Sequence, residues 1–532
     1  MGGPRDVEGG ALVNDVIIIG AGITGLHAAA ELEHLLPSAR VLVLEADSRV
    51  GGRLRSARVG DTTVDLGGHY FGSKHRRVNA LVDRLAKEDR IDHVASFASN
   101  PACRSRASGQ WKVSPRSEWY FDINGLSKDC PPSEHITILR SVAAFCALEK
   151  LVDVEHPWNT PMAKELDALT FQEWIDAQDL PSWIVQMWQI SSLGIASVHA
   201  REVSLLWWLW YCASNVSLIE LGNDYDGGPQ QFSVRGGLGA LARRYAASLK
   251  SDVRVNAPVK HVEHGAEHVT VTLISGEQLK ARHVIVAVTP HIAGKRLQFS
   301  PPLCEGRTLL HAQPIGHAVK AVLCYREPWW RHTKGANLNT FLSQPDDAGI
   351  EWAIETSSNQ HRHYALMAFV SDRLVQRVGL EGLKEAVIEA MVEMSGDDRA
   401  RDVLDVVTYD WSTNPWVGGG PNTAMRPNVL SRLQGVLFAS EGERLHFASS
   451  EQSPAFAGYV EGGMASAERA VEHVREALLA ERGERPRRVT KRALARGTDR
   501  LGTMALGAGY AAMTPVWLAR PLFDGVWRLL RR

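Results

Sequence analysis

Near the start of the chain, two short apolar runs flank a longer segment that is rich in alanine and leucine. Asp15–Ile19 is β-branched and suits a buried parallel strand, and Arg40–Leu44 is a second apolar run. Between them, Thr24–Leu36 has the composition of a helix. The pattern predicts a strand, a helix and a second strand in that order, which is typical of an α/β fold.

Three glycines join the first strand to the helix. Gly20, Gly22 and Gly25 have the G-x-G-x-x-G spacing, which permits a tight turn, close approach of a pyrophosphate and close packing of helix on strand. The start of the helix, at Ile23 and Thr24, directs unpaired N–H groups and a positive dipole end at the phosphates. We therefore expect a dinucleotide site here rather than a purely structural glycine turn.

The second strand ends in an acid. Glu45 lies twenty residues beyond Gly25, where dinucleotide-binding folds contact ribose hydroxyls. We expect Glu45 and the following Ala46 to contact the cofactor.

Two further segments have strand patterns, and one long region reads as helical. Val269–Ile274 alternates apolar and polar residues, and His283–Val288 is apolar, which predicts two strands around a turn. Residues 135–220 read largely as helices, with breaks at Pro157, Pro161 and Pro181.

Several later segments resemble the FAD-dependent amine oxidases of the monoamine oxidase type. Arg49–Arg53 and Asp65–Tyr70 resemble the glycine-containing segments that these enzymes place along FAD, and Gly458–Gly463 resembles their closing segment. Arg53 can neutralise a pyrophosphate, with a solvated surface charge as the alternative. The resemblance runs from about residue 14 to residue 475, which is most of the chain.

The resemblance implies an α/β fold in which a Rossmann-type FAD-binding domain is interleaved with a substrate domain of mixed sheet and helices. It assigns residues 14–90, 236–300 and 436–475 to the FAD-binding domain, and residues 91–235 and 301–435 to the substrate domain. The cofactor-binding residues that it implies are Gly20, Gly22, Ile23, Thr24, Gly25, Glu45, Ala46, Gly52, Arg53, Gly67, Gly68, His69, Tyr70, Val259, Trp411, Ser450, Glu451, Tyr459 and Val460.

The resemblance assigns catalytic roles to Lys320 and Tyr459. In the family, the lysine that matches Lys320 holds a water near flavin N5 and is implicated in reoxidation of the flavin by O2; a buried ammonium would also favour the anionic reduced flavin. Tyr459 matches an aromatic residue that flanks the amine in front of the flavin. The alternatives are a surface lysine at a strand edge and an ordinary packed tyrosine.

The same resemblance places Trp207, Ile219 and Trp416 in the substrate pocket. Trp207, Trp208 and Trp210 stand at helical spacing, which is more typical of a hydrophobic core than of a cofactor site. One face of that helix is nevertheless expected beside the amine cavity.

The chain departs from the family pattern at three places. Gly420 stands where animal monoamine oxidases have a cysteine bonded to the flavin, so we expect FAD to be bound non-covalently. Pro421 stands in place of the second tyrosine of the aromatic cage, and Trp416 is a candidate for the missing wall. Ser449 replaces a glycine that approaches the flavin closely. His69 lies where the family varies, and a flavin-lining or packed histidine is favoured over a catalytic base.

Composition narrows the class of protein further. The net charge of −1 over 532 residues does not favour a nucleic-acid partner. The 6 cysteines show no CxxC pair and no metal-ligand spacing, so we expect no metal and free thiols in a reducing, cytoplasmic compartment. The first fourteen residues lack the layout of a signal peptide. Assembly as a homodimer stays an open alternative.

Residues 476–532 form a basic and apolar tail outside the region of resemblance. Leu501–Ala519 holds nineteen residues without a charge, close to the about 20 that a membrane-spanning helix needs, but its glycines and proline weaken that pattern. The basic flanks and tryptophans favour peripheral or C-terminal attachment at a membrane surface, with docking on protein as the alternative.

The function that the resemblance implies is FAD-dependent oxidative deamination of a small-molecule amine. A hydride passes to flavin N5, the imine hydrolyses to a carbonyl product, and O2 is reduced to H2O2. One alternative is an FAD-dependent desaturase or dehydrogenase acting on a biosynthetic intermediate, which the loss of the second cage tyrosine supports. Another is a non-catalytic binding protein on the same fold.

Overall fold

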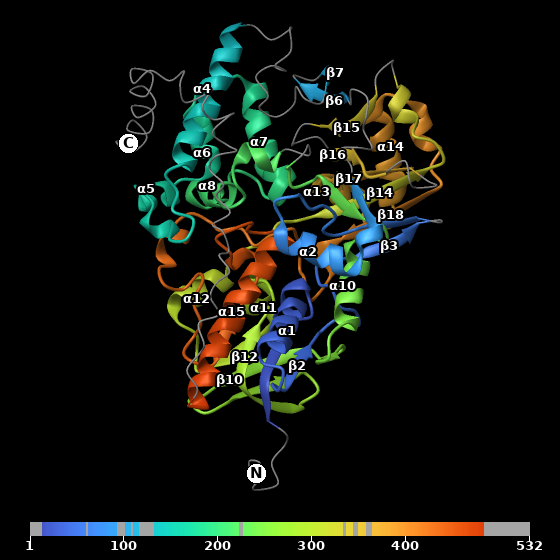
Figure 1. The fold of residues 1–532 in the computed structure, drawn as a ribbon. Helices are drawn as coiled ribbons and strands as arrows, with labels where there is room; N and C mark the ends of the chain where they lie inside the picture. The colour runs from blue at the N-terminus through green and yellow to red at the C-terminus, as the bar shows by residue number, and fades with distance from the viewer. Residues whose placement is uncertain are drawn as a thin grey trace.

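The computed structural model contains two large sheets and a group of helices (Figure 1). It describes residues 13–59, 62–92, 102–107, 110–115, 132–222, 227–333, 337–343, 349–357 and 364–483.

The first strand of the chain lies in the middle of the larger sheet. β1 (Asn14–Ile19) pairs in parallel with β2 (Val41–Leu44) on one side and with β12 (Gln278–Val286) on the other. The order is β13, β10, β11, β12, β1, β2, β9, and β19 pairs with β12. The remaining strands are β9 (Asp252–Arg254), β10 (Val259–His264), β11 (Val269–Leu273), β13 (Gln298–Ser300) and β19 (Leu445–Phe447).

The predicted strands of this sheet are confirmed, and one is longer than its apolar run. The structure places strands over Asp15–Ile19, Arg40–Leu44 and Val269–Ile274 to within one residue at each end. β12, by contrast, begins at Gln278 rather than at His283. Its first residues alternate between exposed and partly buried side chains, so the apolar run marked only the buried half of the strand.

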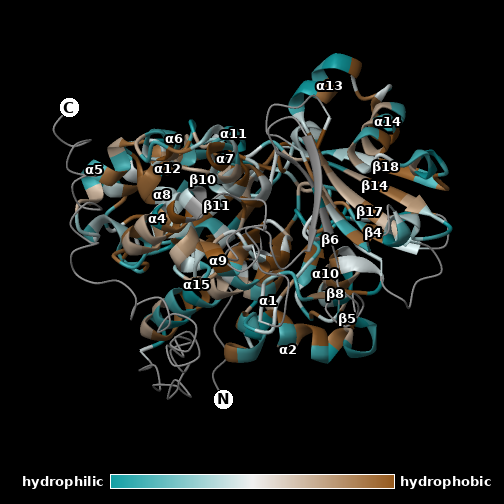
Figure 2. Cartoon of the chain, turned by 90° about the horizontal axis from the view of Figure 1, so that it is seen from above, coloured by the Kyte–Doolittle hydropathy of each residue, from teal (hydrophilic) through white to brown (hydrophobic). Residues whose placement is uncertain are grey.

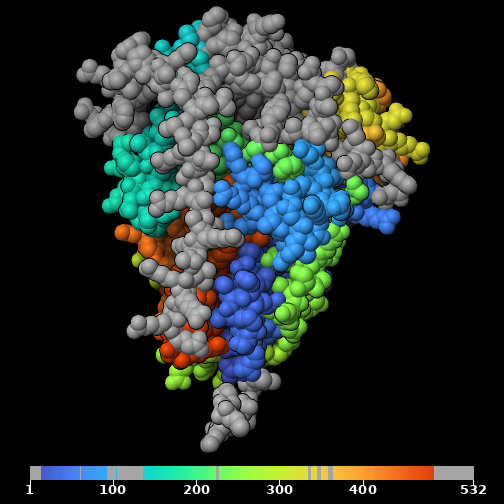
Figure 3. Space-filling view, viewed as in Figure 1, coloured from blue at the N-terminus to red at the C-terminus, as the bar shows by residue number. Residues whose placement is uncertain are grey.

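Helices from opposite ends of the chain cover this sheet together. α1 (Ile23–Leu35) packs along α15 (Val460–Glu481), and α10 (Gly237–Ala247) lies on the other side of α1 (Figure 3). Their apolar side chains share one buried cluster with α2 (Arg76–Leu85). The predicted helix Thr24–Leu36 is confirmed to within one residue.

The second sheet is mostly antiparallel and holds β14 (Val319–Tyr325) near one edge. Its order is β18, β14, β17, β16, β15, β6, β7, and every residue of β14 is buried. The other strands are β6 (Ala102–Ala107), β7 (Gln110–Pro115), β15 (Leu338–Leu342), β16 (Ile350–Glu355), β17 (Tyr364–Val370) and β18 (Asp405–Asp410). α13 (Asp372–Val378) and α14 (Leu383–Ser395) accompany it.

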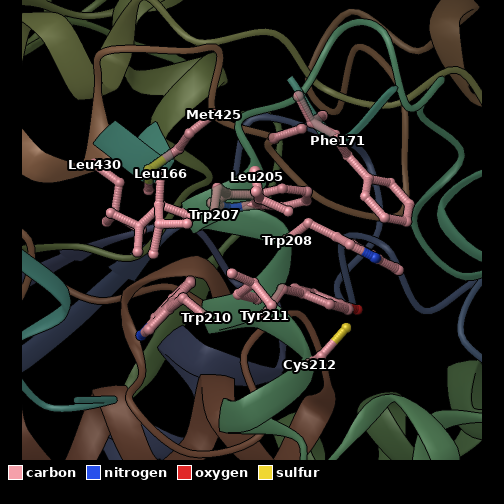
Figure 4. Close-up of a cluster of buried hydrophobic side chains, with 14 of the residues drawn as sticks. Leu166, Phe171, Leu205, Trp207, Trp208, Trp210, Tyr211, Cys212, Met425 and Leu430 are labelled. Carbon is pink, nitrogen blue, oxygen red and sulfur yellow. The ribbon is translucent and has the colours of Figure 1, made fainter. Parts of the chain in front are cut away.

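The helical group lies beside the second sheet, as the view from above shows (Figure 2). It comprises α4 (Pro132–Glu149), α5 (Ala163–Ala168), α6 (Phe171–Asp176), α7 (Ser182–Ala196), α8 (Leu205–Ser214) and α9 (Leu218–Leu221), so the predicted helical region is confirmed. α8 is buried along almost its whole length and carries three tryptophans and a tyrosine into one hydrophobic cluster (Figure 4).

Short elements complete the described residues. The ribbons are β3 (Ser56–Val59) with β4 (Thr62–Asp65), and β5 (Arg90–Asp92) with β8 (Phe232–Val234). The short helices are α11 (Pro290–Arg296), α12 (Glu305–His311), η1 (Lys87–Asp89), η3 (Pro157–Asn159), η4 (Trp329–His332), η5 (Asp398–Arg401), η6 (Trp411–Thr413), η7 (Leu430–Arg432) and η8 (Ser450–Gln452).

The C-terminal helix runs beyond the predicted end of the FAD-binding domain. α15 continues to Glu481, whereas that domain was predicted to end at residue 475. The apolar segment Leu501–Ala519 lies outside the described residues. Among the helices that the structure describes, none is long and apolar enough to cross a membrane.

Candidate active site

The glycine turn after β1 is shaped by contacts that exclude side chains. Gly20 has a φ of +107°, and a Cβ on Gly25 would lie 1.9 Å from the carbonyl oxygen of Gly20. By contrast, a Cβ on Gly22 would meet no protein atom within 4 Å. The turn is therefore packed against the sheet on one side and open at Gly22, the position at which a pyrophosphate would approach.

Two helix starts meet beside this turn. Neither α1 nor α15 has a side-chain N-cap, and no acidic residue stands in the first turn of α1. A Cβ on Gly463, in the first turn of α15, would lie 2.6 Å from the Thr24 hydroxyl in the first turn of α1. The two uncapped ends, each with a positive dipole end, form an arrangement that suits a diphosphate-containing cofactor.

Glu45 stands at the end of β2, next to the glycine turn. Its two carboxylate oxygens accept hydrogen bonds from the backbone N–H groups of Ala21 (2.7 Å) and Asp47 (2.9 Å). Burial raises the pKa of Glu45, and these two hydrogen bonds partly offset that shift. Each oxygen keeps a second lone pair, so the carboxylate can also accept ribose hydroxyls. Val259 begins β10 and packs in the same buried cluster as Leu44.

Arg53 is paired with an acid from the far end of the chain. Its guanidinium donates to both carboxylate oxygens of Glu451 (2.7 and 3.2 Å), to the Ser450 hydroxyl (3.1 Å) and to the carbonyl of Pro421 (2.5 Å). Burial by itself would raise the pKa of Glu451, but the charge and hydrogen bonds of Arg53 lower it. Arg53 is therefore a half-buried cation whose charge is shared with Glu451, and its contact with a pyrophosphate stays a prediction.

Lys320 and Trp411 converge on one short stretch after β4. The Lys320 ammonium donates to the carbonyl of Gly67 (2.9 Å), and the Trp411 indole donates to the carbonyl of Leu66 (2.8 Å). A Cβ on Gly67 would lie 1.9 Å from the carbonyl oxygen of Arg53, so this stretch is also pressed against the Arg53 segment. Lys320 lies on β14 of the second sheet, and Trp411 begins η6 directly after β18. The stretch that they hold belongs to the predicted cofactor-binding segments.

The Lys320 side chain is deeply buried. It is 3% exposed. Burial lowers the pKa of the ammonium to about 8, and the nearby negative charge of Asp65 offsets part of that shift. The alternative of a surface lysine is wrong, because all seven residues of β14 are buried.

The residues that follow Gly67 form the edge of this region. Gly68 is exposed, and the rings of His69 and Tyr70 lie 4.1 Å apart, centroid to centroid. His69 also lines a small cavity together with Asp65, Thr356 and Ser357. Contact of Gly68, His69 and Tyr70 with the cofactor stays a prediction.

Tyr459 occupies the N-cap position of α15, and Val460 begins the helix. The Tyr459 ring is half-buried, with its centroid 5.4 Å from that of His75. Behind it, the Tyr211 hydroxyl donates to the side-chain oxygen of Asn422 (3.0 Å), whose nitrogen donates to the carbonyl of Gly458 (3.2 Å). The network fixes the turn that presents Tyr459.

The three predicted pocket residues lie in different surroundings. Trp207 is 1% exposed in the α8 core (Figure 4), whereas the side chain of Ile219 is 49% exposed on α9. Trp416 is half-buried under the Arg296 guanidinium, which lies 5.5 Å from its ring centroid. The structure does not gather these residues into one wall, and their roles stay predictions.

Comparisons with known proteins place the chain and its fold in a family. A family model described as flavin containing amine oxidoreductase matches residues 23–475. The chain belongs to this family. It is 31% identical over 463 residues to a putative flavin-containing monoamine oxidase, AofH, of Mycobacterium tuberculosis, covering 86% of this chain and 96% of that protein. It is 27% identical over 484 residues to amine oxidase B of the dog, covering 87% and 86%.

Solved structures of amine oxidases share the fold of this flavin-containing amine oxidoreductase. Cyclohexylamine oxidase from Brevibacterium oxydans aligns with a TM-score of 0.77 at 27% identity, over 88% of this chain and 100% of that one. A putrescine oxidase bound to putrescine aligns with a TM-score of 0.74 at 22% identity, over 87% and 99%, and supports the fold alone.

The protein is accordingly a flavin-dependent amine oxidoreductase, and its cofactor is FAD. The described residues fit that group at the open Gly22, at the two uncapped helix starts and at the two free lone pairs of Glu45. Gly420 offers no thiol for a covalent bond, and a Cβ there would meet only Ala318, at 3.8 Å. Among the described residues, no group of three or more His, Cys, Asp or Glu side chains is arranged to hold a metal ion.

Sequence reasoning missed several buried polar residues beside this amine oxidoreductase site. Asp65 was visible inside a glycine motif, but its burial and its partners were not. Asn422 and Tyr211 gave no signal, because their hydrogen bond joins segments that are 211 residues apart. His75 was not singled out, although it is buried and burial lowers its pKa to about 3.

Proposed function

We propose that this protein catalyses the oxidative deamination of an amine carried on an apolar group, giving an imine that hydrolyses to a carbonyl compound. When bound, FAD would supply the acceptor for the electron pair and hydrogen lost from the carbon beside the amine nitrogen, and O2 would be the final electron acceptor, giving H2O2. Its similarity to a cyclohexylamine oxidase and to monoamine oxidases supports the substrate class.

The observation that carries the proposal is the convergence of Lys320 and Trp411 on adjacent carbonyls. Lys320 holds a positive charge in a dry site, where it stabilises negative charge that develops nearby far more than it would in water. Trp411 is only 4% exposed, and its indole is fixed by Leu66, so it excludes water from that place. Lys320 is held in place by β14, and Trp411 by η6, which directly follows β18.

Tyr459 would orient the neutral amine. Its ring stands at the start of α15, held in place by the Asn422 network, and burial raises the pKa of its hydroxyl well above its ordinary range. A neutral aromatic side chain offers an apolar wall with a defined face, and such a wall orients a small amine without taking its proton.

This proposal also includes the predicted cofactor-binding residues, the predicted pocket residues and the predicted division into interleaved domains. It likewise includes attachment of the tail to an anionic membrane surface, which rests on the basic residues around Leu501–Ala519. A homodimer is an alternative to a monomer.

A second candidate function is a desaturase or dehydrogenase with the same cofactor. Pro421 favours this second function, because it stands in place of the second tyrosine of the family's aromatic cage. Its carbonyl oxygen instead accepts a hydrogen bond from Arg53. A non-catalytic protein on this fold is the third candidate.

The deciding experiment is a panel of primary and secondary amines with purified protein and peroxide detection. Peroxide formed in proportion to the amine consumed supports the oxidase. Flavin reduction under anaerobic conditions without peroxide in air supports the dehydrogenase, and colourless protein supports the non-catalytic reading. Lys320→Met should slow reoxidation of the reduced protein by O2 about 10²–10³-fold in stopped-flow mixing. The exposed Lys260→Met on β10 is the control.

A further inference from the structure

The carboxylate of Asp65 is buried at the end of β4, and among the described residues no charged side chain contacts it directly. Asp65 is 2% exposed. One carboxylate oxygen accepts a hydrogen bond from the Ser56 hydroxyl (2.6 Å), and the other accepts one from the backbone N–H of Leu238 (3.1 Å), in the first turn of α10. A charge this deep requires compensation, and two neutral donors provide only part of it.

The chain around Asp65 is built so that no side chain separates it from its neighbours. Gly237 has a φ of +80°, and a Cβ there would lie 2.4 Å both from a carboxylate oxygen of Asp65 and from the Ser56 hydroxyl. The next two carbonyls after Asp65 accept the Trp411 indole and the Lys320 ammonium. Three successive residues thus each accept one hydrogen bond: Asp65 from α10, Leu66 from Trp411 and Gly67 from Lys320.

We propose that Asp65 is a positioning residue for Lys320, and that its carboxylate keeps the Lys320 side chain charged and directed at the carbonyl of Gly67. Asp65 is the charge that acts on Lys320 in this buried region, and Lys320 acts on Asp65 in return. The consequence for reoxidation rests on the proposed function, whereas the pairing itself does not.

The ionisation of the two groups agrees with this arrangement. Burial raises the pKa of Asp65 to about 6, with Ser56, the α10 backbone and Lys320 opposing the shift. Burial lowers the pKa of Lys320 to about 8, with Asp65 opposing it. Between these values both groups are charged. Removing the carboxylate takes away the influence that raises the pKa of Lys320, so that pKa must fall further.

Other titratable or charged side chains near the pair stand on β18, just before β3 and just after β4. Tyr409 of β18 stands opposite Lys320 in the sheet, and the guanidinium of Arg55 covers the Tyr409 ring at 4.4 Å from its centroid. His69 shares the small cavity with Asp65. From β17 the neighbour is uncharged, because Phe369 stands opposite Lys320. The test must therefore isolate Lys320 from these neighbours.

The first measurement does not depend on activity. The free energy of unfolding is measured against pH for the parent protein and for Lys320→Met, and the difference between them is taken. The same difference is then measured for two proteins that also carry Asp65→Asn. The pH at which Lys320 loses its proton should move down by about one unit or more in the Asn background. An unchanged pH would overturn the pairing.

The second measurement follows reoxidation of the reduced holoenzyme by O2 against pH. In Asp65→Asn the loss of rate with rising pH should begin about one unit lower, and in a Lys320→Arg background, where the charge is fixed, Asp65→Asn should cause no shift. If Lys320→Met leaves reoxidation unchanged, the proposed role of Lys320 fails, while the stability measurement still decides the pairing.

Two further variants guard against misfolding and non-specific effects. If Asp65→Asn does not fold, Ser56→Ala keeps the carboxylate but removes one donor to it, which raises the pKa of Asp65 and should give a smaller shift in the same direction. Asp167 is a matched control, since it is a fully buried carboxylate held by the Ser204 and Ser431 hydroxyls. Asp167→Asn should leave both pH profiles in place, and a shift there would overturn the assignment to Asp65.

Discussion

Replacing Lys320 with methionine should make the protein more stable at neutral pH. The fold lowers the pKa of this lysine from 10.5 to about 8, and each unit corresponds to about 1.4 kcal/mol. The side chain is 3% exposed, so solvent screening removes little of this effect. Holding the ammonium in the fold therefore costs about 3 kcal/mol at pH 7.

Methionine recovers most of this cost. It cannot donate to the carbonyl of Gly67, and losing that hydrogen bond costs about 1 kcal/mol. The net gain is about 2 kcal/mol. For roughly 470 residues unfolding together, an unfolding entropy of about 2 cal/mol/K per residue converts this gain into a rise of about 2 °C in Tm.

The gain has a definite pH dependence. Between the folded pKa of about 8 and the unfolded value of 10.5, the unfolded state binds more protons than the folded state, so the stability of the lysine protein rises with pH. The lysine penalty should fall from about 3 kcal/mol at pH 7 to about 1 kcal/mol at pH 10. The advantage of the methionine variant should therefore be lost across this range.

The assay is thermal unfolding of the holoprotein at pH 7 and pH 10, followed by flavin fluorescence with flavin content matched. Lys260→Met, at an exposed position of β10, should not reproduce the rise at pH 7. A methionine variant that is less stable than the parent at pH 7 would refute the reasoning, because the surroundings would then stabilise the ammonium rather than penalise it.

Three other outcomes follow from the structure. Acid precipitation should leave the yellow FAD in the supernatant, since Gly420 has no thiol; colour in the pellet would contradict this. Gly463→Ala should reduce flavin occupancy, because its Cβ would lie 2.6 Å from the Thr24 hydroxyl. The control Gly265→Ala makes only an ordinary contact at 3.5 Å and should keep full flavin occupancy. An equal ratio of flavin to protein absorbance in the two variants would count against a role of the α1–α15 junction in flavin binding. Truncation before Arg485 should leave a yellow, active protein that no longer sediments with anionic vesicles. A colourless product would make the tail part of the fold.

Local patterns in the sequence were enough to predict the helix, the glycine turn and the acid that lie within one continuous stretch of the chain. The glycine turn, α1 and the acid Glu45 follow one another within one stretch of chain, so their spacing carries the information. The burial of Lys320 could also be predicted, because the apolar residues on both sides of it leave no exposed face.

Residues whose partners are distant could not be predicted in this way. The donors to Asp65 include Leu238, which is 173 residues away, and Lys320 reaches a carbonyl 253 residues away. The position of Trp416 likewise depends on Arg296 from another element. Only the assembled sheets bring such groups together, and a single sequence does not record that assembly.

The pairing of α1 with α15 also sets a limit on when the apolar cluster around α1 can be completed during synthesis. Val471, Val474 and Leu478 of α15 complete the apolar cluster that begins with α1, and β19 joins the same sheet only at residues 445–447. A ribosome must therefore translate nearly the whole described chain before α15 can cover α1, although the glycine turn is among the first residues made. Until then the apolar side of α1 lacks its cover, and exposed apolar surface of this kind promotes aggregation of incomplete chains.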